Sequence, residues 1–193
     1  MVWVTLGLGS NSEPEANLSS GLDELLLQFK DLALSNVYRS KARPARSSIA
    51  QADPDKVIAG DGSSAHEGAD YLNMAVGINT DLPLQDLVAA LKKIEDKHSR
   101  DRSNAKPGKV SLDIDLLTYA DKSGNFNGII LPRPEILTAA HVLWPLSQIA
   151  PRHKHPVLKQ AFSELWQGFD KAQQPITPVQ FVWHERVISK AVG

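Results

Sequence analysis

Two aspartates placed one residue apart have the type and spacing to do chemistry. Asp113 and Asp115 lie inside the apolar run Leu-Asp-Ile-Asp-Leu-Leu at 112–117. Side chains alternate along a strand, so the two carboxylates would share one face about 7 Å apart. Aspartate is disfavoured in strands and like charges repel, and a hard cation would remove both problems. The pattern predicts a magnesium site, because Mg²⁺ takes one or two carboxylates plus phosphate oxygens. A solvated outer face of the strand stays open as the alternative.

A basic segment precedes the aspartates. It contains Arg100, Arg102, Lys106 and Lys109 around a Pro-Gly turn. Phosphoryl transfer is catalysed mainly by positioning and charge neutralisation, so cations beside a magnesium site suit a polyphosphate substrate. A charge run that is merely solvated is the alternative interpretation.

A third polar feature is the pair Tyr71 and Asn73 on one face of a predicted strand at 71–78. The pair offers a ring for stacking and an amide that can bind the edge of a heterocycle. The opposite face of this strand is apolar, which predicts a strand buried on one side.

Hydrophobic periodicity predicts the elements that must position these side chains. Strands are expected at 2–8, 32–40, 71–78, 110–119 and 129–131. Helices are expected at 14–29, 83–94, 135–149 with an interruption at Pro145, and 162–169. The segment 41–69 is poor in large apolar residues and is predicted to be a long loop. The order of elements favours an α+β fold, a ferredoxin-like plait with helices packed on an antiparallel sheet.

Composition limits the class of protein. The 193 residues are enough for one domain, and we expect a core domain at 1–155 with a C-terminal extension, 156–193, packed on it. The net charge of −1 comes from interspersed acidic and basic residues, so no nucleic acid or membrane partner is expected. The sequence has no cysteine and shows no leader or membrane-length apolar run. We expect a cytoplasmic monomer that acts on small molecules.

The motifs, taken in order over about residues 2 to 152, resemble the 6-hydroxymethyl-7,8-dihydropterin pyrophosphokinase family. They are Leu8-Gly9-Ser10-Asn11, Val37-Tyr38-Arg39-Ser40, Tyr71-Leu72-Asn73-Met74-Ala75-Val76, Ile94-Glu95, Arg100 and Arg102, the run 112–117, Leu143-Trp144-Pro145-Leu146 and Ile149-Ala150-Pro151. On these motifs the chain is identified as a divergent member.

The resemblance implies an enzyme of folate biosynthesis with a ferredoxin-like fold. Such an enzyme transfers pyrophosphate from its co-substrate ATP to 6-hydroxymethyl-7,8-dihydropterin and releases AMP. Two Mg²⁺ ions would be held by Asp113 and Asp115, which count as catalytic residues together with Arg100 and Arg102 on a loop over the phosphates. Glu95 would lie on the nucleotide side.

The same resemblance assigns the pterin contacts. Asn73 would bind the pterin edge and Tyr71 would stack on one ring face. Ser40 stands where the family usually has a threonine, and His141 replaces the second stacking aromatic. These four residues are the expected substrate-binding set.

The nucleotide-binding positions depart most from the family pattern. Two arginines that are usual there are replaced by Val110 and Ala139. We expect Lys106, Lys109 and Arg133 to supply nucleotide contacts in their place. Two functions follow from this pattern: a pyrophosphokinase with a remodelled ATP pocket, or a paralogue that binds a pterin-like ligand without pyrophosphoryl transfer.

Overall fold

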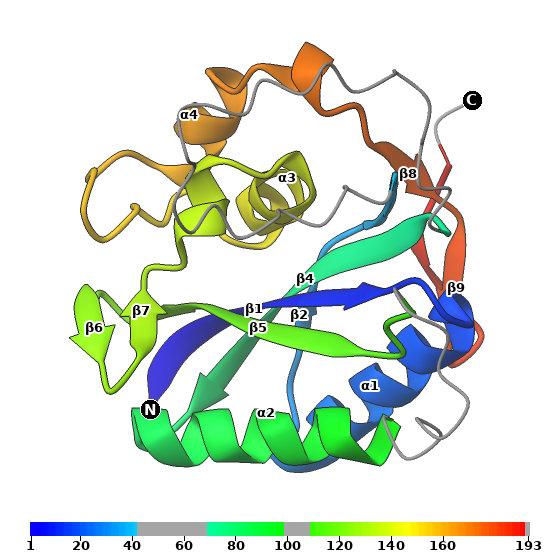
Figure 1. Ribbon diagram of the computed structural model, residues 1–193, viewed down its shortest axis with the longest axis horizontal. Coiled ribbons are helices and arrows are strands. Elements are labelled where there is room, and N and C mark those ends of the chain that lie inside the picture. The colour runs from blue at the N-terminus through cyan, green and yellow to red at the C-terminus, as the bar shows by residue number, and fades with distance from the viewer. Residues whose placement is uncertain (42–68, 99–108, 192–193) are drawn as a thin grey trace, which may run out of the picture.

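A six-stranded antiparallel sheet forms the middle layer of the molecule (Figure 1). The structure is a computed structural model that describes residues 1–41, 69–98 and 109–191. The strands lie in the order β5 (Asp113–Tyr119), β1 (Val2–Ser10), β4 (Tyr71–Thr80), β3 (Val37–Ser40) and β8 (Thr177–Val179), and β2 (Ala33–Leu34) pairs with β4. Strand β5, which carries the two aspartates, and strand β4, which carries Tyr71 and Asn73, therefore lie on either side of β1.

Helices cover both faces of this sheet (Figure 1). One face packs against α1 (Pro14–Phe29) and α2 (Leu84–His98), and the other against α3 (Ala140–Ile149) and α4 (Phe162–Gln167). The remaining elements are the hairpin of β6 (Gly124–Phe126) and β7 (Ile129–Leu131), the hairpin of β9 (Phe181–Trp183) and β10 (Arg186–Ser189), and 3-10 turns at Pro134–Leu137 and Lys171–Gln173.

The path of the chain confirms the predicted fold class. The elements β1, α1, β3, β4, α2 and β5 follow one another, and their strands lie in the order β5, β1, β4, β3. This is the ferredoxin-like arrangement of two crossed halves, in which the first and third of these strands become neighbours at the centre. All their pairings are antiparallel.

The apolar periodicity that predicted helices at 14–29 and 83–94 is confirmed by the buried faces of α1 and α2. In α1 the buried residues include Leu18, Leu22 and Leu25, and in α2 they include Leu87 and Leu91. These positions repeat every three or four residues, so one side of each helix faces the sheet. Together they form the larger of two apolar clusters.

The prediction that residues 71–78 are buried on one side only was wrong. Ala75 is 1% exposed and Asn73 is 7% exposed, although both lie on the face assigned to solvent. Helix α3 packs over that face, and Ala75 joins Leu117 and Leu143 in the second apolar cluster. A strand covered on both faces does not show the burial pattern that its alternating sequence suggests.

The prediction that the helix at 135–149 is interrupted at Pro145 was also wrong. Helix α3 passes through Pro145, and the break falls earlier, between the 3-10 turn that ends at Leu137 and Ala140. Proline inside a helix removes one N–H hydrogen bond and crowds the carbonyl four residues earlier, yet α3 continues beyond Pro145 to Ile149. Similarly, the strand expected at 32–40 is two strands separated at Ser35, whose hydroxyl accepts a hydrogen bond from the Ala75 N–H at 2.9 Å.

Two sequence predictions fall outside the described residues. The loop at 41–69 is described only at its ends, and the basic segment with Arg100, Arg102 and Lys106 is not described. Among the helices of the described ranges, none combines the length and the apolar character needed to cross a membrane.

Candidate active site

The two aspartates lie at the start of β5 and face the same side of the sheet. The register of β5 with β1 places Asp113 opposite Gly9 and Asp115 opposite Gly7. Between them Ile114 points into the core cluster with α2. Their alternation is therefore the one that the sequence predicted, and the apolar neighbours fix the direction in which both carboxylates point.

Both carboxylates are in surroundings that disfavour their charge. Burial raises the pKa of Asp115 to about 7, and the neighbouring charge of Asp113 adds to the shift. Asp113 is the more exposed of the two, and its partial burial together with the nearby Glu95 raises its pKa. Carboxylates kept partly out of water beside one another gain most from a cation.

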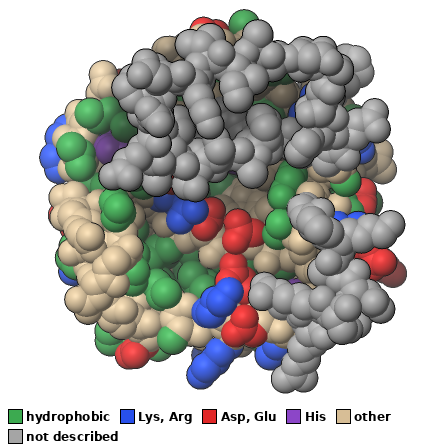
Figure 2. All heavy atoms as spheres, in the orientation of Figure 1, with side chains coloured by type: hydrophobic (Ala, Val, Ile, Leu, Met, Phe, Trp, Pro, Cys, Tyr) green, Lys and Arg blue, Asp and Glu red, His purple; other side chains and the backbone are tan. Residues whose placement is uncertain are grey.

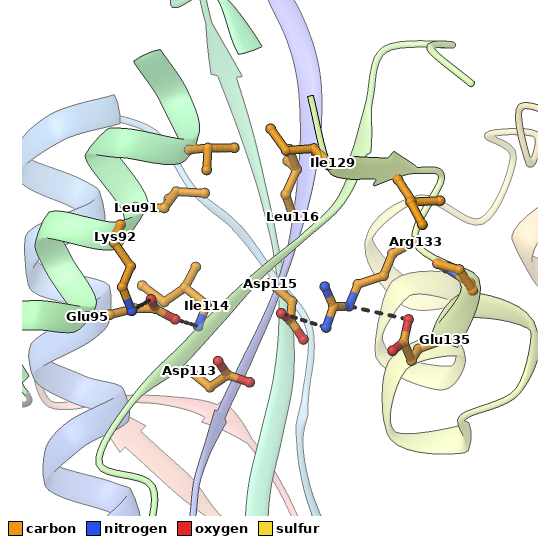
Figure 3. A pocket seen from close by; sticks show the side chains of 14 residues that line it. Leu91, Lys92, Glu95, Asp113, Ile114, Asp115, Leu116, Ile129, Arg133 and Glu135 are labelled. Carbon is orange, nitrogen blue, oxygen red and sulfur yellow. Dashed lines mark hydrogen bonds and ion pairs between the residues drawn. The ribbon is translucent and has the colours of Figure 1, made fainter. Parts of the chain in front are cut away.

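Arg133 provides a cation from a distant part of the chain. Its Nη2 lies 2.9 Å from Asp115 Oδ1, and its Nε lies 3.5 Å from Glu135 Oε2 (Figure 3). The backbone N–H of Arg133 donates to the Leu117 carbonyl at 2.9 Å, which fixes the turn after β7 against β5. The guanidinium thus lies between two carboxylates at the edge of the site.

Glu95 closes the other side of the site from helix α2. Its Oε1 accepts a hydrogen bond from the Ile114 N–H at 2.8 Å, and its Oε2 pairs with Lys92 Nζ at 2.9 Å (Figure 3). Glu95 therefore ties α2 to β5 beside Asp113. Acidic side chains gather in a hollow in the middle of the face in Figure 2, with basic side chains next to them.

The larger of two cavities at the aspartates has a volume of about 520 Å³. Its polar lining includes Lys92, Glu95 and Arg133 with both aspartates. Its apolar lining includes Ile114 and Leu116 of β5 and, from α2 and β7, Val88, Leu91, Ile129 and Ile130. A cavity that is charged at one end and apolar at the other suits an elongated ligand with both characters.

The smaller cavity has a volume of about 220 Å³ and lies on the other side of the same aspartates. It is lined by all four residues assigned to the pterin, which the structure brings together from β3, β4 and α3: Ser40, Tyr71, Asn73 and His141. Asn73 Nδ2 donates to Ser40 Oγ at 2.9 Å, which orients the amide. Burial and the charge of Asp113 raise the pKa of Tyr71.

The floor of the smaller cavity was missed from the sequence. Gly7 and Gly9 line it, and a Cβ at Gly9 would lie 3.3 Å from Asn73 Oδ1. The register across β5, β1 and β4 aligns Asp113, Gly9 and Asn73 in one row. The missing side chain of Gly9 leaves the gap between the carboxylate and the amide open. A glycine on the outward side of the first strand was the available signal.

Three nucleotide-related positions lie away from the described cavities. Lys109 is exposed and lines neither of them. Val110 is bound through its backbone to the turn after β1, where its carbonyl accepts the Asn11 N–H at 3.0 Å. Ala139 is fully buried in the cluster of α3, so an arginine side chain there would have to displace its apolar neighbours.

The donor set at the aspartates fits magnesium in part. The described ranges contain no group of three or more acidic, His or Cys side chains placed to hold a metal. Magnesium keeps several waters and often takes only one or two carboxylates, with substrate phosphates completing its shell. Asp113 and Asp115, with raised pKa values and a shared face on two cavities, fit this requirement.

Comparison with known proteins gives related sequences over most of the chain. The chain is 27% identical to a 2-amino-4-hydroxy-6-hydroxymethyldihydropteridine pyrophosphokinase of Aquifex aeolicus over 165 residues, which is 85% of this chain and 90% of that protein. It is 27% identical to the Pseudomonas aeruginosa protein of the same name over 79% of this chain and 83% of that protein. Other relatives are matched over a smaller share of their length, such as 56% of a Synechocystis protein.

Solved structures support the fold. An HPPK-DHPS complexed with substrates matches with a TM-score of 0.65 at 13% identity, over 97% of this chain and 49% of the other. Wild-type Plasmodium falciparum HPPK-DHPS matches with a TM-score of 0.60 at 15% identity, and the chain spans about half of that protein too. The family model described as 7,8-dihydro-6-hydroxymethylpterin-pyrophosphokinase (HPPK) matches residues 5–151, and the chain belongs to this family.

Proposed function

We infer that the chain is a pterin pyrophosphokinase of folate biosynthesis, with ATP as co-substrate. The family match over residues 5–151 supports this activity and disfavours a paralogue that only binds a pterin. The observation that carries the mechanism is that Asp113 and Asp115 line both cavities. A transfer between two substrates needs reactive groups at the junction of two binding sites.

The larger cavity is the proposed ATP site. Ile130 is 54% exposed there, and with Leu91 and Ile129 it offers an apolar surface for the adenine ring. The charged end of the cavity, with Arg133, faces the aspartates and would receive the phosphates. Glu95 supports this site from α2 through its hydrogen bond to β5.

The smaller cavity is the proposed pterin site. The Tyr71 ring and His141 would pack on the faces of the heterocycle. The Asn73 amide would bind its polar edge, because Ser40 holds one of its N–H groups and the Oδ1 remains directed toward the floor at Gly9. The hydroxymethyl group of a pterin held in this way would point to the aspartates.

Asp113 and Asp115 would hold two Mg²⁺ ions. Metal bound there supplies charge neutralisation at the phosphates and lowers the cost of deprotonating the pterin alcohol. The protein contributes position: β5 fixes both carboxylates on one face, and the core residue Ile114 between them prevents their rotation away. No side chain has to act as a dedicated base in this arrangement.

The basic segment completes the proposal. Arg100 and Arg102 are proposed to bind the transferred phosphates, and Lys106 and Lys109 to contribute charge to the nucleotide. Lys109 is exposed and follows this segment directly in the sequence. Its proposed contact with ATP therefore requires the basic segment to lie close to the larger cavity.

The C-terminal residues are proposed to belong to the same unit. Strand β8 pairs with β3 through Val37 and Val179, and Trp183 Nε1 donates to Asp23 on α1 at 2.8 Å. These contacts support the assignment of 156–193 as an extension packed on the domain 1–155, and we propose that the protein acts as a monomer.

Quantifying AMP formation tests the proposed function. Purified protein supplied with Mg²⁺, ATP and 6-hydroxymethyl-7,8-dihydropterin should produce AMP and the pterin diphosphate in equal amounts. Omitting the pterin should abolish AMP formation. Tight pterin binding with no AMP at any ATP concentration would contradict the assignment and favour the binding-only alternative.

A further inference from the structure

We propose that Arg133 is an exchangeable counterion, which occupies Asp115 until nucleotide and metal arrive together and then transfers to the phosphates. This inference rests on the metal assignment to Asp113 and Asp115 and goes beyond it. It makes Arg133 the residue that couples metal binding to nucleotide binding.

The first support is geometric. Arg133 Nη2 lies 2.9 Å from Asp115 Oδ1, within the distance of a charge-assisted hydrogen bond. The carboxylate oxygen that would serve as a metal ligand is therefore engaged by the guanidinium. A metal ion at Asp115 and this guanidinium draw on the charge of the same carboxylate and, at Oδ1, on the same oxygen, so they compete.

The second support is the position of the guanidinium relative to the larger cavity. Arg133 lines that cavity, but the smaller cavity is lined by Asp113 and Asp115 without it. Its side chain is 34% exposed, so it can reorient toward a ligand without breaking the core. Rotation toward the cavity brings it to where the phosphates of ATP would lie.

The third support is the second carboxylate at the guanidinium. Glu135 Oε2 lies 3.5 Å from Arg133 Nε, farther than the Asp115 contact, and its side chain is 49% exposed. Glu135 would therefore remain as a partner of Arg133 after the guanidinium leaves Asp115. Because the turn at Arg133 is bound through its N–H to Leu117, the exchange needs only the side chain to move.

The consequence is a preference for joint binding of metal and nucleotide. If the ion pair is formed about nine times in ten at a pH where Asp115 is ionised, only about one molecule in ten has Asp115 available to metal alone, and the affinity for metal falls about tenfold. Phosphates that accept the guanidinium remove this competition. Metal and nucleotide therefore strengthen each other's binding, as linkage requires.

Calorimetric titration of Mn²⁺ into Arg133→Met, with and without a non-hydrolysable ATP analogue, tests the proposal. The variant should bind Mn²⁺ alone about tenfold more tightly than the wild type and the analogue about tenfold more weakly. Arg133→Gln should behave in the same way if Arg133→Met folds poorly. The matched control is Lys92→Met, which removes an equal charge from the same cavity but from a lysine that pairs with Glu95.

The outcomes are distinct. The control should tighten Mn²⁺ binding clearly less than Arg133→Met does, because Lys92 pairs with Glu95 and acts on Asp113 only through space. Equal tightening in Lys92→Met and Arg133→Met would show a general field effect and overturn the exchange. Unchanged Mn²⁺ affinity in the Arg133 variants, with metal-dependent analogue binding intact, would overturn the exchange alone. Absence of Mn²⁺ binding in the wild type, even with the analogue, would overturn both the exchange and the metal assignment.

Discussion

The two cavities at the aspartates differ in how they are built. The smaller one is formed largely by sheet strands, with glycines as its floor and the Asn73 amide held by Ser40. The larger one is formed by α2, β5, β7 and the turn after β7, and its charged groups pair with one another. A site on strands is preorganised, whereas a site with paired charges must exchange partners when a ligand binds. We therefore expect rigid recognition of the pterin and adjustable recognition of the nucleotide.

Removing a carboxylate at the junction should have the largest effect, because it belongs to both cavities. Asp115→Ala should lower kcat at least about a thousandfold, since transition-state charge at the phosphates would be left unneutralised. Steady-state AMP formation measures this. Asp121→Asn, at an exposed aspartate after β5, is the control and should keep kcat within about twofold. A kcat of Asp115→Ala close to the wild type would contradict the assignment.

Filling the floor of the smaller cavity should weaken pterin binding without changing nucleotide binding. Gly9→Val would place its methyl groups against Asn73 and should weaken pterin binding about a hundredfold, while nucleotide binding stays unchanged. Valine favours strands, so β1 should persist. Fluorescence titration with pterin measures the loss, and Gly9→Ala should give a smaller one. Equal losses for both ligands would mean that the fold, and not the floor, was changed.

The polar edge of the pterin site should contribute less than its floor. Asn73→Leu should weaken pterin binding about thirtyfold, because the polar edge of the ring would lose its partner inside the cavity. Asn79→Leu is the matched control, since Asn79 lies on the same face of β4 but is exposed, outside the cavity. Competition titrations measure the ratio of the pterin affinities of the two variants. Similar affinities in both would remove Asn73 from the pterin site.

The smallest expected effect is on stability. Burial raises the pKa of Asp115 to about 7, above its ordinary value of 3.8. Between these pH values the folded protein keeps a proton that the unfolded chain releases, so the free energy of unfolding should fall as pH rises from about 4 to 7. Asp115→Asn should gain on the order of 1 kcal/mol relative to the wild type across this window. Urea unfolding without metal measures the difference, and a constant difference would argue against the raised pKa.

The sequence predicted the parts of the site that depend on local periodicity. The alternation of Asp113 with Ile114 and Asp115 follows from strand geometry alone, and so do the stripes of α1 and α2. The ferredoxin-like order came from the sequence of elements and the resemblance of motifs.

The remaining features depend on contacts between distant residues. Burial of Asn73 requires α3 to cover β4, and the open floor at Gly9 depends on the register between β1 and its two neighbours. The pairing of Arg133 with Asp115 depends on the turn after β7 meeting β5. Periodicity does not encode such contacts, so this part of the nucleotide site could not be predicted in detail.

The most direct test of the two-cavity arrangement is a crystal structure with Mn²⁺, a non-hydrolysable ATP analogue and the pterin alcohol. We predict anomalous density for Mn²⁺ at Asp113 and Asp115, with the nucleotide in the cavity next to Leu91 and the pterin between Tyr71 and His141. Mn²⁺ bound away from both aspartates, or the pterin in the cavity next to Leu91, would contradict it.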